Sequence, residues 1–210
     1  MPKIGYTEPE RERIREALIN SGLELMAQQG IQHTTVEQIY NQVGISRTFF
    51  YSFFPTKEDL IVEAFYHQQP RIIKYMQNLK NNPDLSLHDC IRRFIYDCCY
   101  GKENRFAVMT VEDQQSIFKH LSSKNNYIFR KKQIDTFTKI LEVFNIHTDE
   151  SKVKLICNQV LSIIIVRKAI PDTLPFLFPD SADEMVDFQI DVLVEFMKTL
   201  QSEQVDSCLK

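Results

Sequence analysis

Glycine is scarce in this sequence of 210 residues, with only five occurrences. An all-β sandwich or barrel needs turn residues at intervals of about 8–12 positions, so the scarcity argues against those folds and favours long helices joined by short connections. Because 43% of the residues are hydrophobic, the chain can bury a sizeable core. Its length allows one large domain or a small domain joined to a larger one.

An excess of positive charge is missing as well. The net charge is −3, and the first 60 residues contain six lysines and arginines against eight aspartates and glutamates. This balance excludes a general electrostatic attraction to nucleic acid. A DNA-binding function would therefore depend on where particular side chains lie.

Long hydrophobic runs and paired-cysteine motifs are also absent. The longest apolar run, residues 160–166, is interrupted by Ser162 and is far shorter than the roughly 20 residues of a membrane span. The N-terminus is polar and no signal peptide is evident. The cysteines are odd in number and form no C-x-x-C motif: Cys90, Cys98, Cys99, Cys157 and Cys208. We therefore expect a cytoplasmic protein without membrane association, in which Cys98 and Cys99 pack as small hydrophobic side chains; an oxidant sensor is the alternative.

Motifs of enzymes and metal sites are missing too. The sequence has no nucleophile elbow, no phosphate-binding loop and no pair of acids on one helix face. Its histidines and cysteines show no metal-ligand spacing. We expect a protein that is not an enzyme, with no catalytic residue, no metal site and no cofactor.

Helix start signals divide the chain into segments. Residues with N-capping side chains precede apolar residues at helical spacing, at Thr7, Ser46, Thr56 and Ser86, and a capping box is expected over Thr34-Thr35-Val36-Glu37. Gly30 and Gly44 are natural helix stops. Residues 7–60 are thus predicted to form three short helices and the start of a longer one.

Later segments are predicted to be helical as well. The fourth helix continues past Phe65, and Pro70 is expected to kink or end it. Further helices are predicted from Ser86, over about residues 124–145 and over 156–170, the last of these apolar on nearly every side. A proline-rich connection, Pro171–Pro179, leads to a final helix from a capping box at Ser181.

Residues 34–54 are predicted to form a helix-turn-helix, because two short helices are joined by a three-residue turn with glycine. The second helix, residues 46–53, would enter the major groove with its N-terminal end first. Phe50 and Phe54 lie four apart and are expected to pack inward, with Phe53 beside them. The outward side chains suit base edges and phosphates: Arg47, Thr48, Phe49, Tyr51 and Ser52.

Lys57 lies in the first turn of its predicted helix. The helix dipole disfavours a cation there by up to about 1 kcal/mol, whereas a bound phosphate would reverse that sign. A solvated lysine beside Glu58 and Asp59 is the alternative. Together with Arg47 and Tyr51, Lys57 is predicted to contact the DNA backbone.

This segment resembles the TetR family of bacterial regulators over roughly residues 10–62, about a quarter of the chain. The pattern that carries the resemblance is Thr34-Thr35-Val36-x-x-Ile39-x-x-x-Val43-Gly44-Ile45-Ser46-Arg47-x-x-Phe50-Tyr51-x-x-Phe54-x-x-Lys57-Glu58-x-Leu60. It implies a phosphate contact at Thr35 and base-reading residues at Arg47, Thr48 and Phe49. It also implies backbone anchors at Tyr51, Ser52 and Lys57. Thr48, Phe49 and Ser52 depart from the family's usual residues, so operator preference does not transfer.

The resemblance further implies an all-α fold of two parts: a three-helix helix-turn-helix domain, residues 1–56, and a larger helical effector-binding and dimerisation domain, residues 57–210. Aromatic and methionine side chains that are candidates for an apolar effector pocket, with plain core as the alternative, are Phe65, Tyr66, Phe94, Phe106, Met109, Phe118 and Tyr127. Residues on the last two long helices that are candidates for a dimer interface, with monomer core as the alternative, are Ile164, Met185, Gln189, Val192, Phe196 and Leu200.

These observations predict a homodimeric repressor that binds a double-stranded DNA operator and is released by a small, largely apolar ligand. Ligand binding would move the fourth helix, with Pro70 as a weak point in that lever. The alternative is a DNA-binding adaptor controlled by a protein partner. A filled core in the second domain would favour that alternative.

Overall fold

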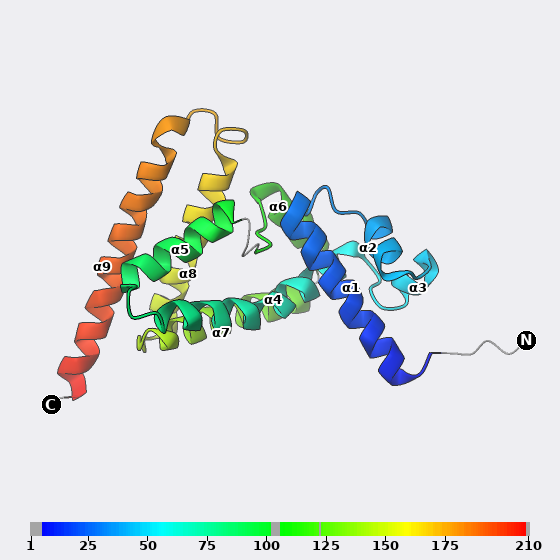
Figure 1. Cartoon of the computed structure of the whole chain (residues 1–210), viewed down its shortest axis with the longest axis horizontal. Helices are drawn as coiled ribbons and strands as arrows, with labels where there is room; N and C mark the ends of the chain where they lie inside the picture. The colour runs from blue at the N-terminus through cyan, green and yellow to red at the C-terminus, as the bar shows by residue number, and fades with distance from the viewer. Residues whose placement is uncertain (1–5, 102–105, 122, 209–210) are drawn as a thin grey trace, which may run out of the picture.

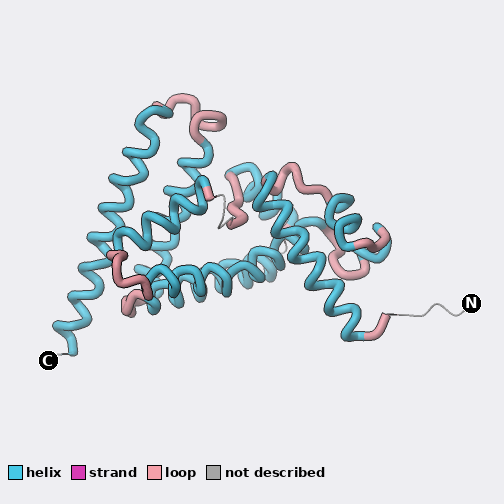
Figure 2. Tube along the Cα trace, in the orientation of Figure 1, coloured by secondary structure: helices cyan, strands magenta, loops and turns pink. Residues whose placement is uncertain are grey.

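The computed structural model describes residues 6–101, 106–121 and 123–208. Within these ranges the chain is built from helices, with no strand (Figures 1 and 2). The helices are α1 (Glu8–Gln29), α2 (Val36–Val43), α3 (Arg47–Tyr51), α4 (Lys57–Lys80), α5 (Leu87–Tyr100), α6 (Val111–His120), α7 (Ser123–Val143), α8 (Glu150–Ala169), the 3-10 turn η1 (Pro179–Ser181) and α9 (Ala182–Cys208). The predicted all-α fold is confirmed.

Most of the described helices begin at a side chain that accepts a hydrogen bond from the helix's own first turn. Thr7, Ser46, Thr56 and Ser86 cap α1, α3, α4 and α5, as predicted. The expectation at Thr34 is wrong by one residue. Thr35 caps α2 and forms the capping box with Gln38. The buried Thr34 hydroxyl instead donates to the Gly30 carbonyl at 2.8 Å, which closes the α1–α2 connection.

One of the two outcomes expected at Pro70 is wrong, and one helix was missed. Pro70 does not end α4, which continues without a break to Lys80. Pro70 is exposed, and on that side of the helix water can hydrogen-bond the carbonyl that proline leaves without a donor. Helix α6 was not predicted, although Thr110 and Asp113 form a capping box at its start.

The N-terminal helices pack around one apolar cluster, to which the start of α4 and residues around α6 also contribute. The fully buried members include Leu18, Ile39, Phe50 and Leu60. Gly22 permits the close approach of α1 to α4, since a Cβ atom there would lie 2.7 Å from a methyl carbon of Leu60. The first helices are therefore fixed on the N-terminal end of α4.

Helices α4, α5, α7, α8 and α9 surround a second, larger apolar cluster. Figure 1 shows α1–α3 at one end of the molecule and the α8–α9 hairpin at the other, with α4 and α7 running between them. Leu60 lies in the N-terminal cluster and Met76 in the second. Helix α4 thus connects the two clusters, while a domain boundary at residue 56 stays a prediction. None of the described helices is both long and apolar enough to cross a bilayer.

Candidate DNA-binding surface and effector cavity

The turn between α2 and α3 has helix-turn-helix geometry. Gly44 adopts a left-handed conformation, with φ 77° and ψ 32°, which glycine reaches without the cost that a Cβ atom would impose. Its N–H donates to Asn41 at 3.1 Å, and the Ile45 N–H donates to Tyr40 at 3.0 Å. The Ser46 hydroxyl then accepts from the Phe49 N–H at 3.2 Å and starts α3.

Helix α3 is shorter than the predicted 46–53, because it ends at Tyr51. The chain leaves the helix through tight turns, in which the N–H of Ser52 donates to Phe49 and that of Phe53 to Phe50. Pro55 comes after Phe54, and the helical conformation is disfavoured for a residue that precedes proline. This restriction keeps α3 from extending through Phe54.

The two faces of this segment are divided as expected. Phe50 and Phe54 are buried. The exposed side chains are Arg47, Thr48, Tyr51 and Ser52. Arg47 extends along the ring of Tyr51, with its guanidinium carbon 5.9 Å from the ring centroid. The placement of these six residues agrees with the expectation, whereas that of Phe49 does not, and the DNA contacts remain predictions.

Phe49 is half-buried rather than free at the end of the helix. Its ring stacks on Tyr6 at a centroid distance of 4.7 Å and meets the edge of Phe53 at 5.0 Å. The Arg11 guanidinium lies 4.6 Å from the Phe53 centroid and 5.7 Å from that of Phe49. Tyr6 and Arg11 therefore border the predicted recognition face. The sequence pattern around residues 34–60 carried no signal for either.

Thr35 and Lys57 are tied to nearby backbone. Thr35 is exposed at the start of α2, where its hydroxyl forms the cap. Lys57 is half-buried, and its ammonium donates to the Ile31 carbonyl at 2.8 Å. Burial lowers the pKa of Lys57, while the charges of Glu58 and Asp113 act in the opposite direction. Lys57 thus holds the α1–α2 connection against α4, and a phosphate contact would have to share or replace that bond.

A cavity of about 430 Å³ opens between α4, α5, α6, α7 and α8. Five of the predicted pocket residues line it: Phe65, Phe94, Phe106, Met109 and Phe118. Tyr66 is not on its wall; its ring lies 5.9 Å from that of Phe129, and the Lys132 ammonium lies 3.6 Å from its centroid. Tyr127 projects away on α7 and is 68% exposed.

Polar residues on the cavity wall were missed, because only apolar side chains were considered. One cation, Arg130, is among them. The uncharged polar residues are Gln68, Gln69, Gln114, Gln133, Thr136, Asn158 and Ser162. The wall therefore offers amide and hydroxyl groups together with aromatic surface.

Cys98 is also on this wall, and it is buried. Burial raises the pKa of its thiol, and it raises the pKa of Cys99 to about 11. Such thiols react slowly at neutral pH, since the thiolate is the reactive form. No cluster of three or more histidine, cysteine or acidic side chains that could hold a metal ion occurs in the described part of the chain.

The residues predicted for a dimer interface divide into two groups. Ile164 and Leu200 are buried within the single chain. Val192 is 57% exposed, and the half-buried ones are Met185, Gln189 and Phe196. Two exposed apolar side chains on the two helices of this hairpin were missed: Phe188 of α9, 68% exposed, and Leu155 of α8, 46% exposed. Phe188 escaped notice because the predicted apolar stripe lies on another face of α9.

Comparison with known proteins bears on the N-terminal segment first. Residues 18–64 match the family model of bacterial regulatory proteins, tetR family. An uncharacterized HTH-type transcriptional regulator of Bacillus subtilis, YuxN, is 31% identical over 75 residues. That alignment covers 36% of this chain and 25% of the relative, so the chain matches only about a quarter of that protein's length.

Solved structures extend the likeness of fold to the remaining helices. A TetR-family regulator from Pectobacterium atrosepticum gives a TM-score of 0.62 at 12% identity, covering 93% of this chain and 97% of that one. RolR in complex with its ligand resorcinol gives 0.55 at 14% identity, covering 92% and 96%. The family model identifies the helix-turn-helix segment, and these structures share the arrangement of the whole chain. Residues 18–64 thus match the tetR family model, and the described helices have the fold of TetR-family structures.

Proposed function

We propose that this protein is a DNA-binding transcriptional regulator, a homodimeric repressor released from its operator by a small, largely apolar ligand. The observation that carries the DNA-binding part is the exposed side of α3. Arg47, Thr48 and Tyr51 face outward there, while Phe50 holds the helix from beneath. All of them lie within the residues that match the family model.

Each exposed group has a distinct use on DNA. Arg47 can donate two hydrogen bonds to the edge of a guanine in the major groove. Tyr51 and Ser52 carry hydroxyls that can contact phosphates, which position the protein without reading sequence. Thr35 lies at the N-terminus of α2, where backbone N–H groups favour an anion. The surface therefore combines base reading with backbone anchoring.

The test begins with selection of a preferred duplex from a random-sequence pool, followed by fluorescence anisotropy. Arg47→Ala should weaken binding to the selected duplex by about 10-fold or more, since a good bidentate base contact contributes about 1–3 kcal/mol. Circular dichroism should show an intact fold. Arg93→Ala removes an exposed arginine from α5 and should leave affinity unchanged. Equal affinities of the Arg47 variant and the wild type would overturn the proposal.

The cavity supports control by a small molecule. Its volume of about 430 Å³ lies within the usual range of ligand pockets, about 300–1,000 Å³. The structure of RolR contains the small phenolic ligand resorcinol. The alternative is control by a protein partner, which a filled core would favour. The open, aromatic-lined cavity gives that alternative less support.

The cavity can be tested by filling it. Val108→Phe places a ring on the cavity wall, whereas Val111→Phe places one at an exposed position of α6. A panel of neutral phenols and aromatic alcohols should raise the melting temperature of the wild type and of the Val111 variant, but not that of the Val108 variant. A panel that shifts none of the three proteins would favour the protein-partner alternative.

Exposed apolar side chains on the α8–α9 hairpin support dimerisation. Phe188, Val192 and Leu155 leave apolar surface open to water, and a second copy would cover it. Phe188→Glu combined with Val192→Glu should convert a dimer into a monomer in sedimentation equilibrium. Tyr127→Glu changes a side chain on α7 that is as exposed as Phe188, and this variant should remain a dimer. A wild-type protein that sediments as a monomer at micromolar concentration would contradict this part.

A further inference from the structure

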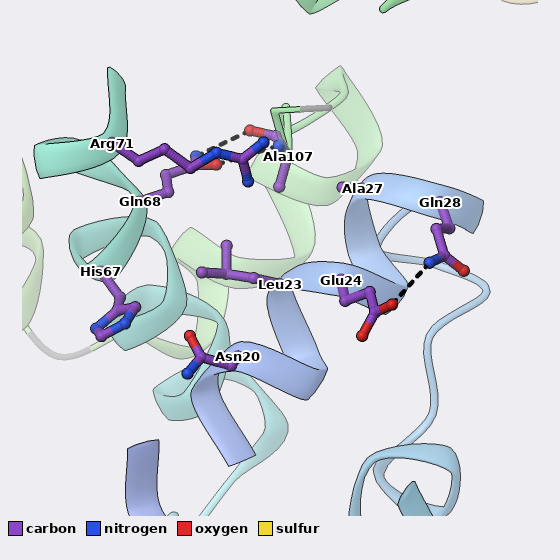
Figure 3. Close-up of a pocket in the computed structure, with 9 residues that line it drawn as sticks. All are labelled: Asn20, Leu23, Glu24, Ala27, Gln28, His67, Gln68, Arg71 and Ala107. Carbon is purple, nitrogen blue, oxygen red and sulfur yellow. Dashed lines mark hydrogen bonds between the residues drawn. The ribbon is translucent and has the colours of Figure 1, made fainter. Parts of the chain in front are cut away.

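A second cavity, of about 350 Å³, lies between α1 and α4, where the N-terminal helices meet the larger helical part of the chain. Figure 3 shows its lining residues: Asn20, Leu23, Glu24, Ala27 and Gln28 from α1, His67, Gln68 and Arg71 from α4, and Ala107. Neither the predicted DNA-binding surface nor the predicted effector pocket includes it. Its size falls at the lower end of the range of small-molecule sites, about 300–1,000 Å³.

The lining divides into an apolar part and a part that carries the cation Arg71. Leu23 and Ala27 of α1 and Ala107 supply apolar surface. His67 and Arg71 lie one turn apart on α4, so that both rise from the same wall (Figure 3). The amides of the remaining lining residues add hydrogen-bonding groups. A complementary molecule has a compact apolar body and a group that accepts hydrogen bonds from a guanidinium.

Arg71 has no carboxylate partner among the residues that the structure describes. Its guanidinium lies over the ring of Phe106, 5.2 Å from the centroid. The acid of the lining, Glu24, is engaged on the other wall, where it accepts hydrogen bonds from the amides of Gln28 at 3.2 Å and Gln42 at 3.1 Å. The cation and the acid are therefore not paired with each other, and the Arg71 side offers a fork of donors that matches a carboxylate.

The two cavities share a hydrogen-bonded contact between Gln68 and Ala107. Gln68 is buried, and its amide donates to the Ala107 carbonyl at 3.0 Å and accepts from the Ala107 N–H at 3.1 Å. Both residues line both cavities. A molecule in the α1–α4 cavity would thus contact the same wall as a molecule in the larger one.

We propose that the α1–α4 cavity is a second ligand site, for a small monocarboxylate with a compact apolar body. The carboxylate pairs with Arg71 beside His67, and the apolar body packs on Leu23, Ala27 and Ala107. Because α1 belongs to the N-terminal helices and α4 reaches the larger cavity, an occupant of this site holds the two at a fixed spacing. The Gln68–Ala107 contact couples it to whatever occupies the larger cavity.

Benzoate is the probe, and methyl NMR of alanine-labelled protein is the measurement. The chain has six alanines; Ala27 lines only the α1–α4 cavity, Ala107 lines both, and Ala169 lines neither. Benzoate should shift the Ala27 and Ala107 signals together and leave that of Ala169 in place. Benzamide, which has the same shape and no charge, should bind at least about 10-fold more weakly.

Variants test the role of the cation. Arg71→Gln should weaken benzoate binding at least about 10-fold, and Arg71→Lys should give an intermediate affinity because it keeps the charge but not the fork. Lys74→Gln removes a cation from an exposed position of α4 outside the cavity and should bind benzoate like the wild type. Ala27→Leu, which fills the cavity, should abolish binding if it retains the wild-type circular dichroism spectrum.

Three results would overturn the proposal. One is a shift of Ala107 without Ala27, which would place benzoate in the larger cavity. The second is an unchanged benzoate affinity in the Arg71→Gln variant, and the third is no shift of either signal at millimolar benzoate. None of these measurements uses DNA, so the site stands or falls independently of the proposed regulatory function.

Discussion

The Gln32 side-chain amide donates a hydrogen bond of 2.8 Å to the Asp113 carboxylate, across 81 positions of the sequence. Gln32 belongs to the connection between α1 and α2, and Asp113 is buried in the first turn of α6. The second oxygen of Asp113 accepts from the Thr110 N–H at 2.9 Å and completes the cap of α6. Since Gln114 and Phe118 of the same helix line the larger cavity, one helix contacts both the cavity and the predicted DNA-binding unit.

Replacing Gln32 by alanine should loosen this connection. The loss of a hydrogen bond to a charged acceptor should lower the free energy of unfolding by about 1–2 kcal/mol, measured by urea denaturation. Gln42→Ala removes a similar bond, from Gln42 to Glu24, between exposed groups and should cost much less. Equal losses in the two variants would show that the Gln32–Asp113 contact has no special part in holding α6 against the N-terminal helices.

Lys57→Met separates two roles of one ammonium group. If Lys57 contacts a phosphate as predicted, the slope of log affinity against log salt should fall in magnitude by about 0.9. The variant should also lose about 1 kcal/mol of stability, because the Ile31 carbonyl loses its donor. Lys74→Met removes the same charge farther along α4 and should change neither quantity. A lower stability with an unchanged salt slope would leave Lys57 with the Ile31 contact alone.

Local chemistry explains what the sequence could predict. Threonine and serine caps act within three residues, so Thr7, Ser46, Thr56 and Ser86 marked the helix starts directly. The inward placement of Phe50 and Phe54 follows from helical spacing combined with the turn at Gly44. These features depend on neighbours in the chain, and a single sequence displays them.

Features that depend on distant segments could not be predicted in this way. The hydrogen bond from Gln32 to Asp113 and the stacking of Tyr6 on Phe49 join residues whose proximity only the tertiary fold creates. The same holds for Gln68, whose amide is matched to the backbone of Ala107. At Pro70 the local rule that proline ends a helix does not hold. Apolar residues of α4 pack in a cluster before the proline and in another after it, and α4 stays continuous.

Ser21→Ala should stabilise the protein. The Ser21 hydroxyl is buried in α1 and has no hydrogen-bond partner among the described residues. Removing a buried unsatisfied hydroxyl should gain about 1 kcal/mol, and alanine is the better helix former. Ser116→Ala, at an exposed position in the middle of α6, gives the gain from helix propensity alone. Urea denaturation should therefore show a larger increase for Ser21→Ala, and an equal or smaller one would mean that the hydroxyl finds a water partner.

The raised pKa values of two cysteine thiols indicate that the protein loses stability at high pH. Burial raises the pKa of Cys99 to about 11 and that of Cys157 to about 12, from an ordinary value of 9.0. Between pH 9 and 11 the unfolded chain therefore binds fewer protons than the folded one, so raising the pH favours unfolding. Their contribution to stability is complete below pH 9 and is lost progressively above it.

Urea denaturation at pH 8, 9 and 10 measures this dependence. The free energy of unfolding should be nearly constant up to pH 9 and should fall towards pH 10. Cys157→Val, which keeps an apolar side chain of similar size, should show a shallower decline than the wild type, whatever its absolute stability. Iodoacetamide should label Cys99 and Cys157 slowly in the folded protein at pH 8 and rapidly in urea, because the thiolate is the reactive form. A wild-type stability that does not change between pH 8 and 10, or rapid labelling of Cys99 and Cys157 in the folded protein, would contradict thiols protected by burial.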